Sequence, residues 1–301
     1  MELSPARSAV AERPSTDGRT GLPANACVGQ AVPRISIVTP SLNQGAFVEQ
    51  AIRSVLRQDY SNVELIVVDG GSTDGSAEII GRYQGRLAHW IRERDSGPAN
   101  ALNKGFERAS GDILGFLNAD DFLLPGSLAV VAREFRDHPE ADVISGHGLL
   151  ARASGELGAP IFSDRWNLEH FAHGACVLVQ PATFFRRSAF QRIGGFNEST
   201  KTCWDMELWA DLALAGARFR AVDEFLAAFR LHDRSISGSE HLRRQRRQDA
   251  LAVRQKMRGH IEAAGDRLYE LFHRLRKFSG HPYRTLTQRW FFRSTLHRWS
   301  L

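Results

Sequence analysis

Two adjacent carboxylates, Asp120 and Asp121, follow directly after a strongly apolar segment of the chain. A carboxylate at the end of a buried strand can reach a hard cation such as Mg²⁺ or Mn²⁺, which often takes only one or two protein carboxylates and completes its shell with phosphate oxygens and water. Two neighbouring acids also repel each other, so the pair favours a compensating cation. The alternative is that one of them only caps a helix beginning near Pro125 or Gly126.

A third acid, Asp69, also ends an apolar segment and is followed by Gly70 and Gly71. Its carboxylate can accept the N–H of a pyrimidine ring, and backbone without side chains lets a flat base approach closely. Taken alone, Asp69 is better explained as a turn acid in a glycine-rich loop. A calcium loop of the EF-hand type is excluded, because Gly71 and Asp74 occupy places that need an oxygen ligand and a glycine. The chain also lacks a Walker phosphate loop and a GxGxxG fingerprint.

Further acids lie in the segment 203–209, which opens an amphipathic helix. The helix dipole favours an acid in the first turn and keeps Asp205 charged and able to accept a proton. Because Asp205 and Glu207 are two residues apart, they point in different directions and at most one of them faces a site. N-capping is the alternative for either acid. His232 follows a strand-like segment and could bind a metal or a phosphate, although a lone histidine usually does neither.

Apolar patterning predicts strands and helices that alternate from residue 35 onward. Continuous β-branched runs are typical of buried parallel strands, and apolar residues three and four apart indicate helices that pack on a sheet. The predicted elements are strand 35–39, helix 48–56, strand 64–68, helix 76–83, strand 87–91, helix 99–109 and strand 113–117. This alternation with short connections demands a parallel sheet with right-handed crossovers.

The polar segments Thr39–Ser41, Asp69–Gly71 and Asn118–Asp121 each follow a predicted strand. In open α/β sheets, ligands bind in the crevice beyond the carboxyl ends of the strands. We therefore expect these three segments to line one site. The predicted fold class is α/β, with a doubly wound, mostly parallel sheet and helices on both faces.

Composition limits the class of protein. The chain has 301 residues, of which 43% are apolar and 24% charged, and this excludes a fibrous or wholly disordered protein. Residues 1–33 contain four prolines without apolar periodicity and are predicted to form a flexible leader. Three separated cysteines, Cys27, Cys176 and Cys203, indicate neither a disulfide framework nor a zinc site. Because membrane-spanning runs and signal-peptide features are missing, a cytoplasmic location is expected.

Positive charge is concentrated at the C-terminal end. Residues 240–301 contain 15 Arg or Lys against 5 Asp or Glu, whereas the chain as a whole carries only +5. Such a segment could attract anionic lipid headgroups or nucleic acid. Apolar residues at helical spacing and a late aromatic group favour an interfacial helix on the inner face of a membrane; they are Leu268, Leu271, Phe272, Leu275, Trp290, Phe291, Phe292 and Trp299. The alternatives are packing on the core and a solvated, arginine-rich face.

Taken together, the segments 35–41, 67–76, 99–106 and 111–121 resemble the nucleotide-binding half of the family 2 glycosyltransferases, which have the GT-A fold. The resemblance covers about residues 33–238, and the ordered set is specific although each motif alone is weak. It implies a GT-A domain over 34–238, with a nucleotide-binding half (34–121) and an acceptor half (122–238), followed by a basic helical extension over 239–301.

The resemblance also implies the donor site. The family's DxD motif matches Asn118-Ala119-Asp120, so Asn replaces the usual first Asp. This leaves Asp120 as the metal ligand, with His232 as a second candidate, and Asn118 as a ribose contact. In the segment 100–105, Leu102 stands where many members carry Arg, and Lys104 is expected to supply the positive charge instead. The implied nucleotide and donor contacts are Thr39, Pro40, Ser41, Asn43, Asp69, Gly70, Ser72, Asp95, Asn100, Asn103, Lys104, Asn118, Ala119 and Asp120.

The acceptor half continues the resemblance. The segments 180–184 and 194–198 are similar to those that precede the family's catalytic acid, and 205–209 resembles the segment that carries it. This match implies that Asp205 is the general base. The stretch 231–235 resembles a late segment that closes over the diphosphate. The expected acceptor-side residues are Gln180, Thr183, Trp204 and Glu207.

The resemblance implies an enzyme that moves a sugar, with inversion, from a nucleotide diphosphate donor to a hydroxyl of a saccharide or lipid-linked acceptor. Mn²⁺ or Mg²⁺ is the expected cofactor, uridine is the favoured base, and cell-surface polysaccharide, lipopolysaccharide or glycolipid assembly is the expected process. A sugar nucleotidyltransferase is the first alternative, but it normally needs a basic glycine-rich loop, and residues 39–45 contain no basic residue. A non-catalytic membrane or nucleic-acid binding protein would explain only residues 240–301. We therefore expect no nucleic-acid partner.

Overall fold

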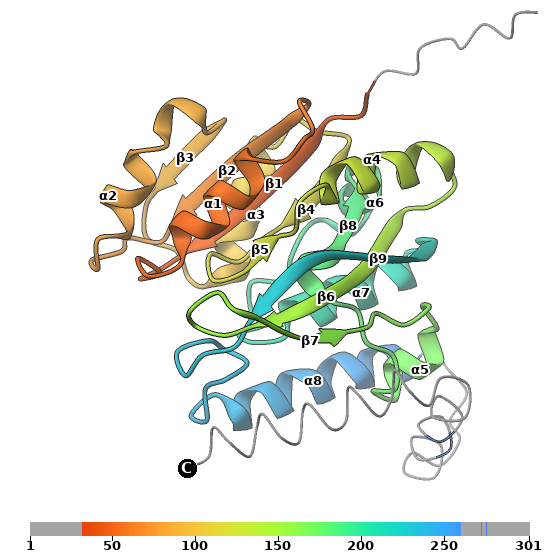
Figure 1. Ribbon diagram of the computed structural model, residues 1–301. Helices are drawn as coiled ribbons and strands as arrows, with labels where there is room; N and C mark the ends of the chain where they lie inside the picture. The colour runs from red at the N-terminus through yellow and green to blue at the C-terminus, as the bar shows by residue number, and fades with distance from the viewer. Residues whose placement is uncertain (1–31, 260–271, 273–274, 276–301) are drawn as a thin grey trace, which may run out of the picture. The chain divides into compact units, whose positions relative to one another are not determined.

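A mixed nine-stranded sheet with helices on both faces forms the part of the chain that the computed structural model describes, residues 32–259, 272 and 275 (Figure 1). The strands follow the order β3-β2-β1-β4-β8-β6-β9-β5, with β7 paired to β6. Their bounds are β1 Ile35–Ser41, β2 Val63–Asp69, β3 His89–Arg92, β4 Ile113–Phe116, β5 Phe122–Leu123, β6 Val143–Ala151, β7 Leu157–Ile161, β8 Thr183–Arg186 and β9 Phe219–Arg230.

Two layers of helices cover the sheet. The helices are α1 Val48–Leu56, α2 Ser76–Gly81, α3 Pro98–Arg108, α4 Ser127–Asp137, α5 Leu168–Ala172, α6 Arg187–Ile193, α7 Trp204–Leu214 and α8 Arg243–Arg258, with 3₁₀ turns η1 Gln84–Arg86 and η2 Gln180–Ala182. Buried side chains of α1, α2 and α4 share one core cluster with the strands, and those of α3, α5, α6, α7 and α8 share the other. The predicted α/β fold with helices on both faces is confirmed.

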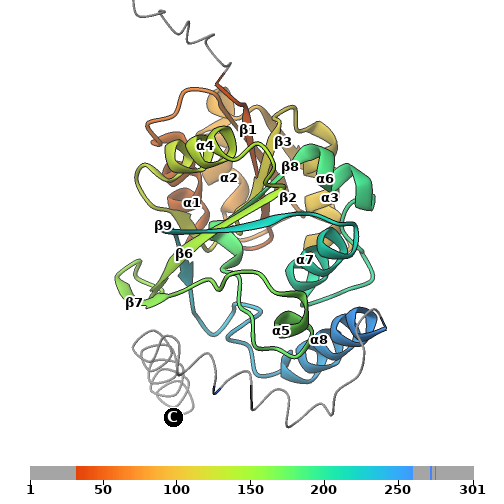
Figure 2. The same ribbon diagram turned by 90° about the vertical axis from the view of Figure 1, so that its right-hand side faces the viewer.

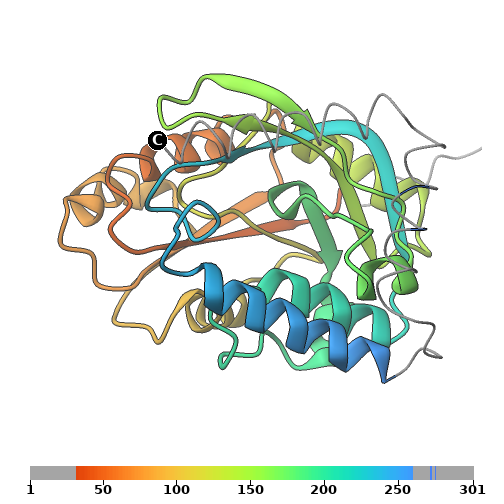
Figure 3. The same ribbon diagram turned by 90° about the horizontal axis from the view of Figure 1, so that it is seen from below.

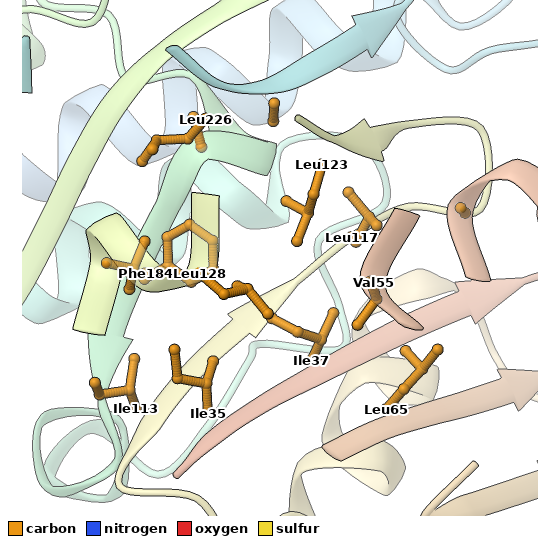
Figure 4. Packing of buried hydrophobic residues seen from close by; sticks show 14 of the residues in the cluster. Ile35, Ile37, Val55, Leu65, Ile113, Leu117, Leu123, Leu128, Phe184 and Leu226 are labelled. Atoms are coloured by element: carbon orange, nitrogen blue, oxygen red, sulfur yellow. The ribbon is translucent and has the colours of Figure 1, made fainter. Parts of the chain in front are cut away.

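The strand sequences explain this sandwich. Along β1, Ile35 and Ile37 point into the first cluster and Val38 points into the second, because successive side chains alternate between the two faces. Figure 4 shows the first cluster, where Val55 of α1 and Leu128 of α4 meet the side chains of the central strands. A parallel strand that is covered on both faces must be apolar throughout.

The first half of the sheet is parallel, as the sequence predicts: β1 pairs with β2 and β4, and β2 pairs with β3. The second half is mixed, because β8 runs antiparallel to β4 and β6, while β6 and β9 are parallel. Parallel pairing still accounts for most of the paired length. Strand β9 begins at Phe219 and is much longer than the strand-like segment predicted over 227–231.

A buried carboxylate secures the N-terminal end of the parallel strands. Glu64 of β2 accepts hydrogen bonds from Ser36, Ser110 and Gly111 and pairs with Arg34 at 2.8 Å. Burial opposes the charged form, but these hydrogen bonds and Arg34 outweigh it and lower the pKa of Glu64. This end of β1, β2 and β4 is therefore held together by a charged, fully bonded side chain.

The first part of the predicted basic extension packs on the domain. α8 lies beside α5 and α7 (Figures 2 and 3), and Val253 and Met257 are buried in the second core cluster. Phe272 and Leu275 are 59% and 55% exposed. The other predicted tail residues, Leu268, Leu271, Trp290, Phe291, Phe292 and Trp299, and the leader up to residue 31 lie outside the described residues. Among the described helices, none has the length and apolar character to cross a bilayer.

Candidate active site

Three buried oxygens gather at the C-terminal end of β1 and β2. Thr39, Ser41 and Asp69 share one sheet face, since Ser41 is the register partner of Asp69 and Thr39 precedes it by two residues. Within the described chain, Thr39 Oγ1, Ser41 Oγ and Asp69 Oδ2 have no hydrogen-bond partner, although Arg92 Nε lies 3.7 Å from Asp69 Oδ2. Asp69 Oδ1 accepts from the backbone N–H of Ser72 at 2.9 Å. Buried polar atoms are nearly always paired, so unpaired oxygens at a sheet edge indicate a ligand surface.

The loops after β1 and β2 are joined by backbone-to-side-chain hydrogen bonds. The N–H of Asn43 donates to Ser72 Oγ at 2.9 Å, and Asn43 Oδ1 accepts from the N–H of Thr73 at 2.9 Å. Asn43 has φ 53°, a left-handed conformation that Asn tolerates better than most residues. Asn43 and Ser72, which were both predicted to contact the donor, therefore use these polar groups to hold the two loops together.

A cavity of about 350 Å³ lies beside this edge. Segments from distant parts of the chain line it: the end of β1, the turn after β4, the start of α7 and residues 229–230 and 234–237. The predicted residues in its wall are Pro40, Ser41, Asp95, Asn118, Ala119, Asp120, Gln180, Trp204 and Asp205. The structure thus brings Asp120 and Asp205 into one cavity.

Asp120 in the cavity wall lies next to His232, which is not itself among the lining residues. His232 Nε2 lies 3.1 Å from Asp120 Oδ2, and the His232 ring packs against Phe47 with centroids 4.6 Å apart. The imidazole is buried, and its Nδ1 has no hydrogen-bond partner among the described residues. The two residues named as metal ligands from the sequence are therefore neighbours.

Asp121 has a different environment from Asp120. It is buried, and its Oδ1 accepts from the N–H of Arg230 at 2.8 Å. Burial and the neighbouring charge of Asp120 hold the pKa of Asp121 well above its usual range, against the opposing effect of Arg230. The capping alternative is wrong for both acids, because α4 begins after Gly126, which provides no side-chain cap.

The buried guanidinium of Arg230 lies close to Asp120 and Asp121 and offsets their negative charge. Its guanidinium donates to the carbonyl of Asp120 at 2.6 Å, to Gln50 at 2.6 Å and to the carbonyls of Arg152 and Ala153, and it lies 4.8 Å from the centre of the Phe47 ring. Burial lowers the pKa of Arg230, while Asp121 and Asp120 counteract this effect. A buried cation close to two carboxylates reduces their mutual repulsion.

The site fits a hard divalent cation with few protein ligands. Asp120 Oδ2 and His232 Nε2 are close enough to bind one ion, and octahedral Mg²⁺ or Mn²⁺ would have its remaining positions open to phosphate oxygens and water. Among the described residues, no group of three or more His, Cys, Asp or Glu side chains is arranged so that it could hold a metal ion. The donor set therefore suits an ion that arrives with a phosphorylated ligand.

Asp205 lies in the first turn of α7, half-buried in the cavity wall beside Trp204. Within the described chain, no side chain is hydrogen-bonded to its carboxylate. Burial raises the pKa of Asp205, and the backbone N–H groups of Met206 and of Asp205 itself only partly oppose this shift. The expectation that the helix dipole keeps this acid charged must be modified, because burial outweighs it. A raised pKa brings a carboxylate closer to the range that suits a general base near neutral pH.

Glu207 points away from the cavity, as its two-residue spacing from Asp205 predicts. Its carboxylate accepts from Asn197 Nδ2 at 3.0 Å and from Thr200 Oγ1, and Lys256 Nζ lies at 3.3 Å. Burial opposes ionisation, but these partners lower the pKa of Glu207. The contacts made by Glu207 are structural, and the N-cap of α7 is Cys203.

Several residues predicted to bind the donor lie outside the cavity wall. Asn100 and Asn103 donate to the two carboxylate oxygens of Glu198, both at 2.9 Å, and so join α3 to the acceptor half. Lys104 pairs with Glu93 at 2.8 Å and donates to the carbonyl of Arg94. The structure therefore gives Lys104 a partner at the protein surface.

Hydrogen bonds hold other predicted residues in or next to the cavity wall. Asn118 Nδ2 donates to Gln180 Oε1 at 3.1 Å, and Gln180 Nε2 donates to the carbonyl of Phe116 at 2.8 Å. Thr183 is buried and bonds to the carbonyl of Val179. A Cβ on Gly70 would lie 2.3 Å from Asp95 Oδ2, so only glycine allows this contact.

Arg234 belongs to the stretch 231–235 that the resemblance places over the diphosphate, but it is not among the site residues named from the sequence. Its exposed side chain lines the cavity, and it has no ion pair or hydrogen bond among the described residues. The signal was present in the sequence, since a basic residue stands two positions after His232 in an otherwise acidic site. A guanidinium placed there can bind phosphate oxygens.

Comparison with known proteins decides the family. The family model described as glycosyl transferase family 2 matches residues 36–194. The chain belongs to glycosyl transferase family 2. Asp205, His232 and Arg234 come later in the chain than the residues that the family model matches. As a member of this family, the protein is a glycosyltransferase.

Relatives with similar sequences are named as glycosyltransferases. A PGL/p-HBAD biosynthesis glycosyltransferase of Mycobacterium tuberculosis is 32% identical over 184 residues, 59% of this chain and 70% of the relative. TuaG of Bacillus subtilis, named for teichuronic acid biosynthesis, is 29% identical over 211 residues, 69% of this chain and 83% of TuaG.

Two crystal structures share the GT-A fold. S. aureus TarS 1-349 in complex with UDP-GlcNAc has a TM-score of 0.58 at 20% identity over 74% of this chain and 70% of TarS 1-349. Another structure of that fragment is matched over 60% of its length. The mannosyltransferase PcManGT from Pyrobaculum calidifontis, in complex with GDP-Man and Mn²⁺, has a TM-score of 0.57 at 19% identity over 85% and 83% of the two chains.

Proposed function

We propose that this family 2 glycosyltransferase transfers a sugar, with inversion at the anomeric carbon, from a nucleotide diphosphate donor to an acceptor hydroxyl. The observation that carries the proposal is the shared cavity: Asp120 and Asp205 line it from opposite halves of the chain. His232 contacts Asp120 at 3.1 Å, and the unpaired oxygens of Thr39 and Asp69 lie at the neighbouring sheet edge.

In this proposal, Asp205 acts as the general base. Its carboxylate takes the proton of the acceptor hydroxyl while the acceptor oxygen forms a bond to the anomeric carbon. The bond from that carbon to the diphosphate oxygen breaks at the same time, and the electron pair leaves with the nucleoside diphosphate. A single displacement of this kind inverts the anomeric configuration.

Asp120 and His232 would hold Mg²⁺ or Mn²⁺, which neutralises negative charge on the diphosphate when it is bound. Arg234 contributes a fixed positive charge on the same side of the cavity. Asn118 is placed by Gln180 so that its remaining polar atoms can meet a ribose hydroxyl. Mn²⁺ in the related fold of PcManGT supports the choice of a divalent cation.

The donor is proposed to be a UDP-sugar. Asp69 offers a carboxylate oxygen without a hydrogen-bond partner to the N–H of a pyrimidine, and TarS, which shares the fold, is described in complex with UDP-GlcNAc. GDP-mannose is the competing donor, because PcManGT is described with GDP-Man. The relatives named for PGL/p-HBAD and teichuronic acid biosynthesis support a saccharide or lipid-linked acceptor in cell-surface glycan assembly.

Peripheral association with the inner face of an anionic membrane through residues 240–301 belongs to the same proposal. On α8, the side chains of Arg243 and Arg244 are exposed, which suits contact with phosphate headgroups. The full chain should sediment with vesicles containing phosphatidylglycerol and should be released by high salt. Equal recovery with purely phosphatidylcholine vesicles would contradict this part of the proposal.

The transfer reaction is tested with a panel of UDP-GlcNAc, UDP-glucose and GDP-mannose, each with and without Mn²⁺. Release of the nucleoside diphosphate, measured with a coupled assay, should require the metal and favour a UDP-sugar. A heat-denatured sample controls for spontaneous hydrolysis. If every donor stays intact with Mn²⁺, also in the presence of simple glycoside acceptors, the proposed reaction is wrong.

A further inference from the structure

Helix α8 lies in the segment predicted to be a basic extension, yet its buried face belongs to the catalytic domain. Val253 and Met257 pack in the same core cluster as Trp204 of α7. Lys256 Nζ pairs with Glu207, also on α7, at 3.3 Å. α8 is therefore fixed against the helix that carries Asp205, although it lies outside the residues 36–194 that match the family model.

A carboxylate on α8 binds the segment just before α7. Asp249 Oδ2 accepts from the backbone N–H of Thr202 at 2.9 Å and from Thr202 Oγ1 at 2.6 Å. Gln245 Nε2 donates to Asp249 Oδ1 at 2.7 Å and so fixes the carboxylate. Because Thr202 lines the cavity three residues before Asp205, this contact sets where the first turn of α7 begins.

One turn earlier on α8, Arg246 binds another segment of the cavity wall. Its guanidinium donates to the carbonyls of Ile236 and Ser239, the latter at 2.8 Å. Ile236 lines the cavity, and the segment 232–239 that contains it begins with His232. The carbonyl of Arg246 itself accepts from Cys203 Sγ at 3.6 Å. Asp249 and Arg246, one turn apart on α8, thus bind two different segments that line the cavity.

We propose that Asp249 and Arg246 are positioning residues of the transferase site. Asp249 places Asp205 through Thr202, and Arg246 places His232 and Arg234 through the backbone of residues 236–239. This inference rests on the proposed function, because it assigns Asp205 to the acceptor and the 232–239 segment to the diphosphate. The C-terminal helix then takes part in the reaction in addition to any contact with a membrane.

The test uses the full chain with UDP-GlcNAc and Mn²⁺, or with whichever donor of the panel the wild type cleaves, and no vesicles. Asp249→Ala should lower kcat by roughly 10- to 100-fold, the range expected when a catalytic group is misplaced by about 1 Å, with little change in donor KM. The acid limb of its kcat profile should move to lower pH, because water gains access to Asp205. Gln248→Ala, on the exposed face one residue earlier, is the matched control.

Arg246→Ala should mainly raise donor KM, by about tenfold or more, because the phosphate-side segment loses its anchor. Arg246→Lys should restore part of this loss, since an ammonium can still donate to one carbonyl. Arg247→Ala is the control, because Arg247 is an exposed arginine on the same helix, without a partner among the described residues.

The outcomes separate this inference from the proposed function. A wild-type chain that cleaves none of the donors contradicts the proposed function. An active wild type whose Asp249→Ala and Arg246→Ala variants match their controls in kcat, KM and pH profile overturns the positioning role. If Asp249→Ala fails to fold, Thr202→Val removes one hydrogen bond of the same contact and should show a smaller shift in the same direction; an unchanged pH profile there overturns the role equally.

Discussion

At the scale of single residues, the site contrasts two acids that sit in one cavity. The carboxylate of Asp120 contacts His232, and the buried Arg230 donates to the carbonyl of Asp120. Asp205, in contrast, has no side-chain hydrogen-bond partner among the described residues. Burial without a partner raises the pKa of Asp205. Paired and unpaired carboxylates in one cavity are a common way to divide charge stabilisation from proton transfer.

The variant Asp205→Asn should therefore lose transfer activity while it keeps its donor. We expect kcat to fall by about 10²- to 10⁴-fold, the usual contribution of general base catalysis. Binding of UDP with Mn²⁺, measured by calorimetry, should stay close to that of the wild type. Normal turnover by this variant would rule out Asp205 as the base.

The direction of the Asp205 shift predicts the pH dependence. The base must be ionised to accept a proton, so activity is full above the pKa of Asp205 and is lost as the pH falls through it. Because burial raises this pKa, the acid limb of the kcat profile should lie above the range of an ordinary aspartate. An acid limb at the ordinary aspartate value would show that water reaches Asp205 freely.

Removal of the metal-side carboxylate should have a different effect. Asp120→Ala should weaken Mn²⁺-dependent binding of UDP by at least roughly 10- to 100-fold, while metal-independent binding changes little. Asp233→Ala is a suitable control, because Asp233 is exposed and adjacent to His232. Calorimetric titrations with and without Mn²⁺ measure the difference, and equal losses in both would contradict a metal role for Asp120.

At the scale of elements, the close contact between α3 and the parallel strands depends on Gly105. A Cβ at this position would lie 2.3 Å from Val38 Cγ1 and 3.2 Å from Val68 Cγ2. Gly105→Ala should therefore destabilise the fold by roughly 1–3 kcal/mol, the usual cost of overpacking. Gly85→Ala is the control, since no atom lies within 4 Å of its added Cβ. Denaturant unfolding of both variants provides the measurement, and equal midpoints would contradict the prediction.

The sequence predicts elements well where one pattern repeats. The predicted strands and helices from 35 to 117 all occur, because buried parallel strands and amphipathic helices have distinct apolar periods. In the second half of the sheet, β6 and β8 were not predicted from the sequence, and β9 was predicted too short. These strands combine mixed pairing directions with bulges, such as the register shift around His147, which break simple alternation.

Prediction of the site from the sequence has a similar limit. Segments that follow strands could be predicted to converge, and Asp69, Asp120 and Asp205 were named from their positions in the chain. The orientation of Lys104 could not be predicted, and this is why it turned out to pair with Glu93 outside the cavity. For Glu207, the spacing from Asp205 did predict that only one of the two acids faces the site, but not which partners the other one binds. Arg246 and Asp249 could not be found either, because their roles depend on how α8 packs against α7.

At the scale of the whole molecule, the parallel strands are unequally stabilised at their two ends. Glu64 accepts hydrogen bonds from its neighbours at one end, while oxygens of Thr39, Ser41 and Asp69 have no hydrogen-bond partner at the other, within the described chain. A nucleotide that bonds to these oxygens completes the polar contacts of the fold. At a concentration of 100 times its Kd, a ligand that binds only the folded state adds about 2.7 kcal/mol of stability.

UDP with Mn²⁺ should accordingly raise the midpoint of thermal unfolding by roughly 5–10 °C under these conditions. The variant Asp69→Asn should show a smaller rise, and scanning fluorimetry can measure both. A wild-type midpoint that does not move would contradict nucleotide binding at this edge. Since proteases act on opened chains, a cell that runs short of the sugar donor should degrade this enzyme faster, so that its abundance follows the supply of its own substrate.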